Sequence, residues 1–353
     1  MYYKANCKFF HGELPCRPHK EYNVKCENCS YYEEIKGKIL IIKLGAIGDV
    51  IRTTPLIHKI KNELPSYSIW WLTHTPEVIP SIVDNKMQFN LESILVIENT
   101  EFDWLINLDK DPYACALASK INAKKKSGFY LKNGKPAPIN KFAEHKFHTG
   151  LFDDINKANK KSYLEEIFEI CEWKFSKEEY ILDKPTFIDF KIKNDNKIIV
   201  GLNTGCGGRW TSRLWKEEYW EKLIALLQEN NYFPLLLGGE QEHEKNLRLS
   251  QKSGCFYPGF FPLKEFFSLV NACDTIVTAV TMALHIAIAL KKKVVLINNI
   301  FNPNEFELYG RGIIVEPDKP CQCFFSPKCK NTEYFCLDTL EPLKVFNAIK
   351  ESF

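Results

Sequence analysis

The chain has 353 residues and a formal net charge of +3, enough length for two α/β domains and too little charge for a dedicated nucleic-acid binder. No apolar run approaches the roughly 18 residues of a membrane-spanning helix. The first residues, Met-Tyr-Tyr-Lys-Ala-Asn-Cys, lack an apolar signal core. We therefore expect a cytoplasmic protein with at most a peripheral membrane association.

Residues 1–37 are expected to form a small cysteine-rich, metal-binding segment. Its cysteines are Cys7, Cys16, Cys26 and Cys29. In a reducing compartment, clustered cysteines indicate metal ligands more than disulfides, and the Cys-x-x-Cys spacing of the last two suits a tetrahedral metal. His11 and His19 are possible substitute ligands. The alternative is a loop with free thiols.

The first α/β domain is expected over residues 38–180. Its apolar run from Ile39 to Leu44 predicts a buried parallel strand, and Gly45 and Gly48 follow before a helix begins. Such a strand, turn and helix open a doubly wound domain, whose ligands bind at the carboxyl ends of the strands. Asp49 would lie there as a helix N-cap or as a catalytic carboxylate. The turn is not a dinucleotide-binding fingerprint, because the third glycine of that pattern is missing and an aspartate follows the second.

Further along this domain we predict strands at 68–74, 93–97 and 102–108 and helices at 113–121 and 162–173. Asp109 and Asp111 follow the third of these strands, where they could touch substrate or, as we prefer, cap the next helix. Residues 120–146 carry eight lysines, which indicate a solvated face or, alternatively, an anionic acceptor. Glu144, His145 and His148 lie in the same irregular stretch and are candidate acceptor contacts. A polar linker is expected at 176–196.

The second domain, residues 181–337, opens like the first. Strands are predicted at 197–203, 232–237, 275–278 and 293–298, with helices at 217–228 and after Thr281. A glycine-rich turn follows the first of these strands, and its glycines would let the backbone N–H groups approach an anion. The candidate donor-binding residues here are Asn203, Thr204, Gly205, Gly207, Arg209 and Arg213. The alternative is a flexible surface turn with solvated arginines.

Two later stretches of this domain could also contact a donor. Thr281, Met282 and His285 open a helix after a strand, although a histidine among apolar neighbours is more often a core residue. The loop 301–310, which contains Glu305, follows another strand and interleaves polar and aromatic side chains. That pattern suits a nucleoside or sugar, or equally a plain packed loop.

The second cysteine cluster lies near the end of this domain. Its members are Cys321, Cys323, Cys329 and Cys336. Four thiols with Pro320 and Pro327 as turn markers fit a compact metal knuckle, which accepts zinc or iron. Apolar residues at helical spacing then predict a C-terminal helix within residues 338–353.

The stretch Lys43-Leu-Gly-Ala-Ile-Gly-Asp-Val-Ile-Arg-Thr-Thr-Pro55 resembles the opening motif of the heptosyltransferase-like glycosyltransferases, family 9. The resemblance runs from about Lys38 to the C-terminus. It implies a GT-B architecture, with two facing Rossmann-like domains and a C-terminal helix that packs back on the first. It also implies that Asp49 is the general base, with Gly48 and Arg52 beside it as acceptor contacts.

The resemblance extends to the second domain. Arg213-Leu-Trp215 matches the family's Lys/Arg-x-Trp element, which contacts the donor diphosphate. Thr281 and His285 match an Asp-Ser/Thr-Gly-x-x-His element, but Val280 and Met282 stand where the family has aspartate and glycine. Because that aspartate contacts the donor sugar, the sugar identity is open. Some relatives also carry an iron-bound cysteine finger near the C-terminus, which the second cluster resembles.

The expected function is an inverting transfer of a sugar, such as heptose from ADP-heptose, to a hydroxyl of a lipopolysaccharide core sugar, another glycan or a protein. The cysteine-bound zinc or iron would be structural, and no catalytic metal is expected. The alternatives are a nucleotide-sugar epimerase on the same fold and a non-catalytic metal-binding or redox-sensing scaffold.

Overall fold

The computed structural model describes residues 2–353, which divide into two compact units. The first comprises the chain up to Gly45, Thr54–Phe147 and Ile167–Lys174. The second comprises Ala46–Thr53, His148–Glu166 and Phe175–Phe353. Two stretches of the expected first domain, 46–53 and 148–166, thus belong to the second unit. None of the helices in residues 2–353 is long and apolar enough to cross a membrane.

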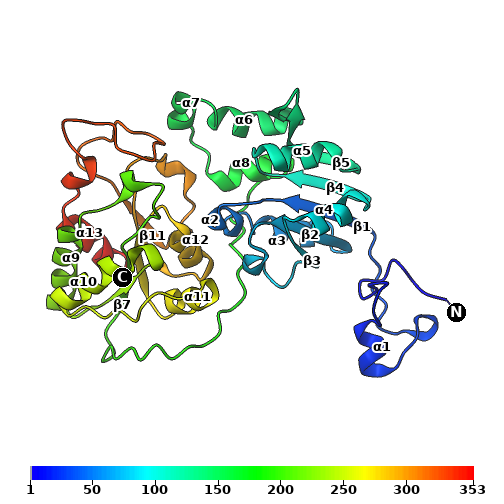
Figure 1. Ribbon diagram of the computed structural model, residues 1–353, viewed down its shortest axis with the longest axis horizontal. Helices are drawn as coiled ribbons and strands as arrows, with labels where there is room; N and C mark the ends of the chain where they lie inside the picture. The colour runs from blue at the N-terminus through cyan, green and yellow to red at the C-terminus, as the bar shows by residue number, and fades with distance from the viewer. Residues whose placement is uncertain (1) are drawn as a thin grey trace. The chain divides into compact units, whose positions relative to one another are not determined.

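The first unit is built on a six-stranded sheet of order β3-β2-β1-β4-β5-β6 (Figure 1). Its strands are β1 (Gly37–Ile42), β2 (Tyr67–Thr73), β3 (Asn85–Gln88), β4 (Phe102–Asn107), β5 (Ala123–Lys132) and β6 (Lys135–Pro138). All neighbouring pairs are parallel except β5 and β6. Alternate residues of β1, such as Leu40 and Ile42, share a buried core with Phe102, Ile97 and Leu117, so helices α4 and α5 cover this face.

The helices of this part of the chain are short. They are α1 (Arg17–Tyr22), α3 (Leu56–Glu63), α4 (Leu91–Glu98) and α5 (Pro112–Lys120), with α6 (Lys141–Thr149) and α8 (Tyr163–Ile170) having residues in both units. Asp111 caps α5, because its Oδ1 accepts the backbone N–H groups of Tyr113 and Ala114 at 2.8 and 3.4 Å. The capping interpretation of Asp111 is confirmed.

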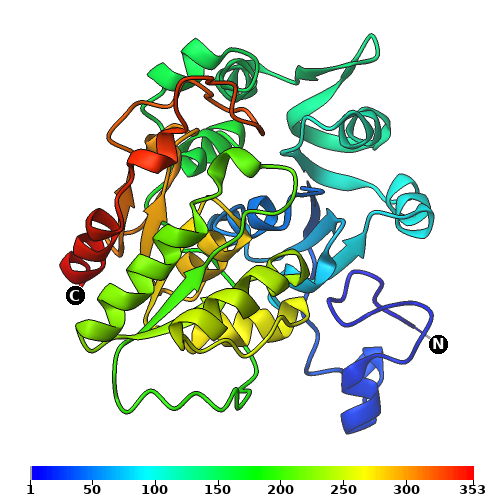
Figure 2. The same ribbon diagram turned by 60° about the vertical axis from the view of Figure 1, so that its left-hand side comes forward.

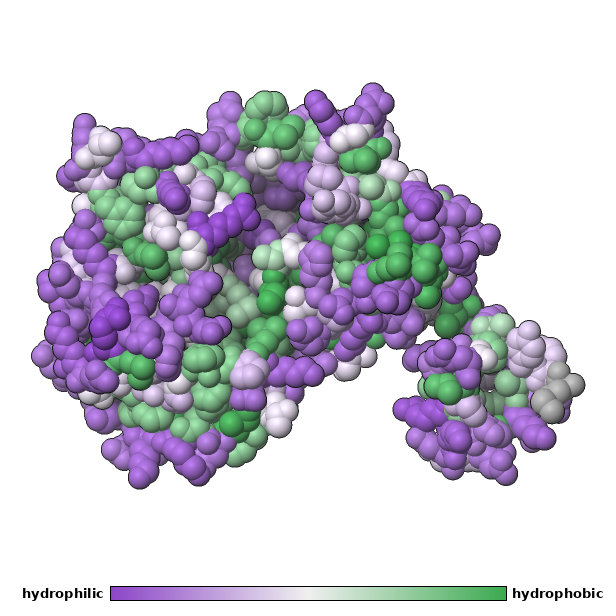
Figure 3. Space-filling model, viewed as in Figure 1, coloured by the Kyte–Doolittle hydropathy of each residue, from purple (hydrophilic) through white to green (hydrophobic). Residues whose placement is uncertain are grey.

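Two predictions for this unit were wrong. Residues 93–97 lie in helix α4 rather than a strand, because Asn90 accepts the N–H of Ser93 and caps a helix whose outer face is exposed. Figure 3 shows hydrophobic residues on the surface over α4, where Leu91, Leu95 and Val96 are exposed. The stretch that holds Glu144 and His145 is also not irregular, since it forms helix α6 after the β5–β6 hairpin.

The second unit contains a fully parallel sheet of order β11-β10-β9-β7-β8. Its strands are β7 (Ile199–Asn203), β8 (Phe233–Leu237), β9 (Thr275–Ala279), β10 (Lys293–Ile297) and β11 (Gly312–Val315). Its helices are α2 (Ile47–Ile51), α7 (Asp153–Ala158), α9 (Glu217–Glu229), α10 (His243–Ser253), α11 (Leu263–Asn271), α12 (Met282–Ala289) and α13 (Pro342–Glu351). The predicted strands are confirmed within two residues. No helix or strand occurs in residues 171–198.

The core of this sheet includes the C-terminal helix, and the expected contact of that helix with the first domain stays a prediction. Val345, Phe346 and Ile349 of α13 are buried with residues of β7, β9, β10 and α9, so α13 packs within the second unit. Figure 2 shows α13 beside α9 at this sheet. The apolar periodicity correctly predicted the helix but could not reveal which sheet it covers.

Candidate active site

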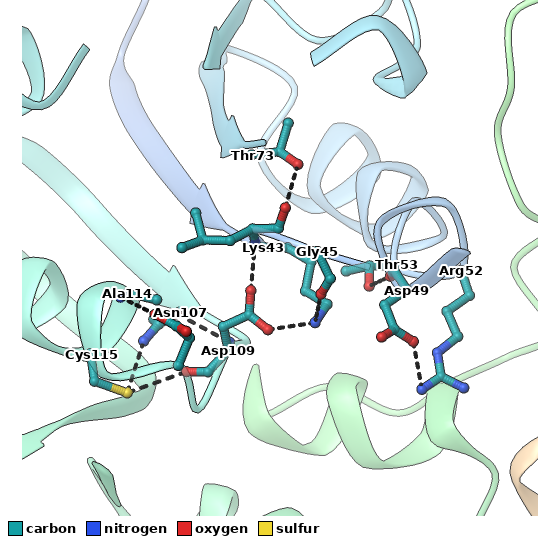
Figure 4. Close-up of polar contacts among 12 residues, drawn as sticks. Lys43, Gly45, Asp49, Arg52, Thr53, Thr73, Asn107, Asp109, Ala114 and Cys115 are labelled. Atoms are coloured by element: carbon teal, nitrogen blue, oxygen red, sulfur yellow. Dashed lines mark hydrogen bonds and ion pairs between the residues drawn. The ribbon is translucent and has the colours of Figure 1, made fainter. Parts of the chain in front are cut away.

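Helix α2 carries the candidate base. The N-cap position belongs to Ala46, so Asp49 lies in the first turn and is not the N-cap. Asp49 Oδ1 pairs with Arg52 Nη2 at 3.0 Å, and 36% of the Asp49 side chain remains exposed (Figure 4). The helix N-terminus and Arg52 both favour a charged carboxylate at this place.

Arg52 is a largely buried cation, with 14% of its side chain exposed. Its guanidinium lies 3.5 Å from the centroid of the Tyr163 ring, and its Nε is buried without a hydrogen-bond partner among the described residues. Burial opposes the charged form, but the carboxylate of Asp49 and the nearby Tyr163 and Glu305 hold the pKa of Arg52 above its ordinary value. Arg52 therefore stays charged and orients the carboxylate of Asp49.

Gly48 lets α2 approach α12. A Cβ at this position would lie 2.6 Å from His285 Cδ2 and 3.4 Å from Met282 Cα, so only glycine fits against α12. His285 is buried, and its ring stacks on Tyr180 with centroids 6.2 Å apart. Burial and the neighbouring charge of Arg52 lower the pKa of His285 to about 3. His285 is therefore neutral at pH 7, although Asp49 partly offsets the shift.

The second sheet has its topological switch point between β7 and β9, the place where such sheets bind ligands. The register pairs Asn203 with Thr278 there. Asn203 Nδ2 donates to Thr278 Oγ1 at 3.0 Å, to Thr281 Oγ1 at 3.3 Å and to the carbonyl of Gly205 at 3.1 Å. The sequence-predicted residues Asn203, Gly205 and Thr281 thus lie together at the ends of these strands.

Arg213 lies beside the glycine turn in a short 3-10 helix, η3 (Thr211–Arg213). Its Nη1 donates to the carbonyl of Val280 and its Nη2 to that of Cys206 at 3.3 Å, while Nε is buried and has no hydrogen-bond partner in the described part of the chain. The side chain is nearly buried, no ion pair joins it to a carboxylate among residues 2–353, and burial lowers its pKa. A buried guanidinium without a counter-charge is costly, which makes this a place for an anion.

Val280 takes a specific part in this arrangement. It stands where the resembling motif has an aspartate, and it supplies only a backbone carbonyl to Arg213. The departure from the motif thus leaves a valine, and no carboxylate, at this position beside Arg213.

The sequence analysis missed Lys245. This residue of α10 donates from Nζ to the carbonyl of Thr204 at 2.7 Å, and burial lowers its pKa. Its neighbour Asn246 accepts from Thr204 Oγ1 at 2.6 Å. The glycine turn is therefore flanked by two cations, Arg213 and Lys245. The sequence did offer a signal for Lys245. The Gly238-Gly239 pair marks the end of β8, and α10, which carries Lys245, follows it.

The remaining predicted donor residues lie at the edges of this arrangement. Arg209 and Gly207 are exposed, and Gly207 has a φ of +71°, which favours glycine. Met282 is the first residue of α12, and Glu305 ends a 3-10 turn close enough to Arg52 to affect its pKa.

Asp109 has a structural partner within the first unit. Lys43 Nζ lies 2.6 Å from Asp109 Oδ1 and 3.0 Å from the carbonyl of Gly45, and Asp109 Oδ2 accepts the N–H of Leu44 (Figure 4). Both side chains are nearly buried. This ion pair shapes the loop after β1. The preferred interpretation of Asp109 as a cap was wrong, because Asp111 is the N-cap of α5, and contact of Asp109 with an acceptor stays a prediction. His145 lies on α6.

The cysteine clusters differ in how their thiols are arranged. Within residues 2–353, no group of three or more histidine, cysteine or acidic side chains converges as a metal would require. The thiols of the second cluster are free but lie close together in pairs: Cys323 and Cys329 have Sγ atoms 3.7 Å apart, and the Cys321 thiol forms a hydrogen bond with Cys336. Backbone N–H groups of Cys323 and Lys330 donate to Cys321 Sγ and Cys323 Sγ at 3.3 and 3.0 Å.

Comparison with known families decides the assignment of the chain. Residues 96–334, well over half of the sequence, match glycosyltransferase family 9 (heptosyltransferase). The chain belongs to glycosyltransferase family 9. It is accordingly a glycosyltransferase. A search of curated proteins found no match.

Solved structures share the GT-B fold with this family 9 chain. A glycosyl transferase family 9 protein from Veillonella parvula DSM 2008 has a TM-score of 0.69 at 16% identity, covering 91% of this chain and 98% of its own. E. coli heptosyltransferase WaaC, solved with ADP-2-deoxy-2-fluoro heptose, has a TM-score of 0.62 at 14% identity, and the match covers 90% of this chain and 100% of WaaC. The iron-containing dodecameric glycosyltransferase TibC from enterotoxigenic E. coli H10407 has a TM-score of 0.53 at 15% identity, and the match covers 90% of this chain and 76% of TibC. At these identities the likeness establishes the fold alone.

Proposed function

We propose that this glycosyltransferase transfers a sugar, most simply heptose, from a nucleotide donor such as ADP-heptose to a hydroxyl of a glycan or protein, with inversion at the anomeric carbon. The observation that carries the proposal is Arg213, a nearly buried guanidinium at the switch point of a parallel sheet that has no carboxylate partner within residues 2–353. Two of the similar solved structures, WaaC and TibC, are named with an ADP-heptose compound, which supports this choice of donor.

The donor diphosphate would lie against the glycine turn. Arg213 and Lys245 flank the turn, and exposed backbone N–H groups around Gly207 add donors to an anion. Negative charge grows on the diphosphate as the sugar leaves, so these cations stabilise the transition state more than the ground state. Asn203, Thr281 and Glu305 supply polar groups for the nucleoside and sugar.

Asp49 would act as the general base. Its carboxylate accepts the proton of the acceptor hydroxyl while that oxygen forms a bond to the anomeric carbon. The bond from that carbon to the diphosphate oxygen breaks, and its electron pair leaves with the nucleotide. Arg52 holds the carboxylate through an ion pair at 3.0 Å. His285, neutral at pH 7, adds no competing positive charge beside Asp49.

We further propose a structural zinc or iron at the second cysteine cluster. Paired thiols and backbone N–H groups that donate to sulfur fit thiolate ligands, which are the form that binds metal. Cys321, Cys323, Cys329 and Cys336 would hold the ion. When bound, it would link distant parts of an irregular loop and take no part in the transfer. For Cys7, Cys16, Cys26 and Cys29 the side-chain arrangement offers no support, so the proposal is limited to the second cluster.

The test is turnover with defined substrates. ADP-heptose is incubated with candidate acceptors, lipopolysaccharide core oligosaccharides and hydroxyl-bearing peptides, and release of ADP is measured. We expect ADP release with an acceptor and a product whose anomeric configuration, read by NMR, is opposite to that of the donor. Retained configuration, or no transfer from any ADP-sugar, would contradict the proposal.

A further inference from the structure

The segment 321–336, here called the cysteine loop, is bonded to the turn that carries Arg213. The N–H of Ser212 donates to the carbonyl of Pro327 at 3.1 Å, and Ser212 Oγ donates to the carbonyl of Ser326 at 2.6 Å. Ser212 is buried and directly precedes Arg213. The loop therefore fixes the backbone from which the Arg213 side chain starts.

Asn299 forms a second connection. Its Nδ2 donates to the carbonyl of Ser212 at 2.9 Å and to Cys336 Sγ at 3.4 Å. One amide group thus joins a thiol of the cysteine loop to the turn beside Arg213. A change in the position of Cys336 would disturb the bond that Ser212 receives.

Phe325 forms a third connection through aromatic rings. The Arg213 guanidinium lies 5.3 Å from the Trp210 ring centroid and 5.5 Å from that of Phe301. Phe325 of the cysteine loop packs edge-on against both rings, at 5.7 and 5.4 Å between centroids. The loop thus supports both surfaces on which the guanidinium rests.

The cysteine loop has little regular structure to hold its own shape. Between β11 and Cys336 the described chain forms no helix or strand. Its conformation depends on contacts such as the 3.7 Å approach of Cys323 to Cys329 and the bond from the N–H of Ser326 to the carbonyl of Cys323 at 3.0 Å. Those contacts set the positions of Ser326 and Pro327, which bond Ser212.

We infer that the cysteine loop is a positioning element for Arg213, with Ser212, Asn299 and Phe325 as positioning residues that set the affinity for the donor diphosphate. This inference rests on the proposed function, in which Arg213 binds that diphosphate. In this role the cysteines hold the loop that positions Arg213, whichever metal they bind.

The test compares ADP with adenosine, because Arg213 acts on phosphate alone. Calorimetry on the full chain should find that Ser212→Ala, Asn299→Ala and Phe325→Ala each weaken ADP binding roughly three- to tenfold, with adenosine binding unchanged. A variant that merely loosens the fold would weaken both ligands. Phe353→Ala is the matched control, since Phe353 is 50% exposed against 49% for Phe325 and also packs on an aromatic ring.

The outcomes separate this inference from the proposed function. If Arg213→Ala binds ADP like wild type, the diphosphate site itself is wrong. If Arg213→Ala weakens ADP binding but Phe325→Ala and Asn299→Ala do not, the positioning role is overturned. Phe325 is half exposed, so Phe325→Ala should fold even if Ser212→Ala does not. In that case the ADP affinity of Phe325→Ala decides whether the cysteine loop positions Arg213.

Discussion

Asp49 combines two properties at one residue, an ion pair with Arg52 and partial exposure to solvent. The ion pair orients the carboxylate, and exposure lets a hydroxyl reach it. A helix N-terminus suits a carboxylate, so this arrangement fits the proposed role of Asp49 as the general base.

Replacing Asp49 by asparagine tests this role. Asp49→Asn keeps the volume and removes the base, so turnover with ADP-heptose should fall by about two to four orders of magnitude. ADP affinity should stay nearly the same, because Asp49 lies outside the proposed diphosphate site. Steady-state rates beside calorimetry make the comparison, and wild-type turnover in the variant would leave Asp49 as a helix residue only.

His285 provides a prediction about pH. Its pKa is about 3 in the folded protein, because of burial and then Arg52, and near 6.5 when unfolded. Between these values the unfolded chain binds a proton that the folded chain does not, so stability present above pH 6.5 is lost as pH falls toward 3. His285 contributes at most about 1.4 kcal/mol per pH unit to the slope of the free energy of unfolding against pH.

Urea unfolding of wild type and His285→Asn at pH 7, 6, 5 and 4 measures this slope. The variant should lose stability less steeply on acidification, whatever its stability at pH 7. Parallel curves for the two proteins would show that His285 is not held neutral by the fold.

At the scale of elements, the contact of α2 with α12 is set by Gly48. A Cβ there would come within 2.6 Å of His285 Cδ2, whereas a Cβ on Gly45 would meet nothing closer than 4.0 Å. Gly48→Ala should therefore destabilise the protein by about 1–3 kcal/mol, with Gly45→Ala as the tolerated control.

A double-mutant cycle identifies the cause of that loss. His285→Ala removes the ring atom that the new methyl group meets, so the combined variant should be more stable than the two separate losses predict. Strict additivity of Gly48→Ala and His285→Ala would mean that the two side chains do not meet.

At the scale of the whole molecule, the sequence predicted most of the strands but not every element. Apolar runs predicted the parallel strands, because buried strands such as β1 and β7 are nearly continuous in apolar residues. The same logic misassigned residues 93–97, since a short apolar run does not distinguish strand from helix and the Asn90 cap decided the outcome.

The candidate site shows the same limit. Asn203, Arg213 and Thr281 were found because strand ends and glycine turns mark them in the sequence. Lys245 was missed because its contact with Thr204 joins segments far apart in the chain. The grouping of α2 with the second unit was also hidden, since it depends on the fit between Gly48 and His285.

The purified chain as a whole should contain close to one equivalent of zinc or iron, bound by the second cysteine cluster. Chelation should lower its melting temperature, because metal binding contributes to folding. Elemental analysis of wild type and of a Cys323→Ser, Cys329→Ser variant makes the measurement. Equal metal content in both would exclude these thiols as ligands, and metal-free wild type would exclude the site.

The central claim is that a buried, uncompensated Arg213 binds the donor diphosphate. The most direct measurement is calorimetric titration of ADP into wild type, Arg213→Ala and the exposed control Arg209→Ala. We predict a loss of about 2–3 kcal/mol for Arg213→Ala, roughly 30- to 150-fold in Kd, and a small change for Arg209→Ala. Equal ADP affinity in wild type and Arg213→Ala would contradict the account.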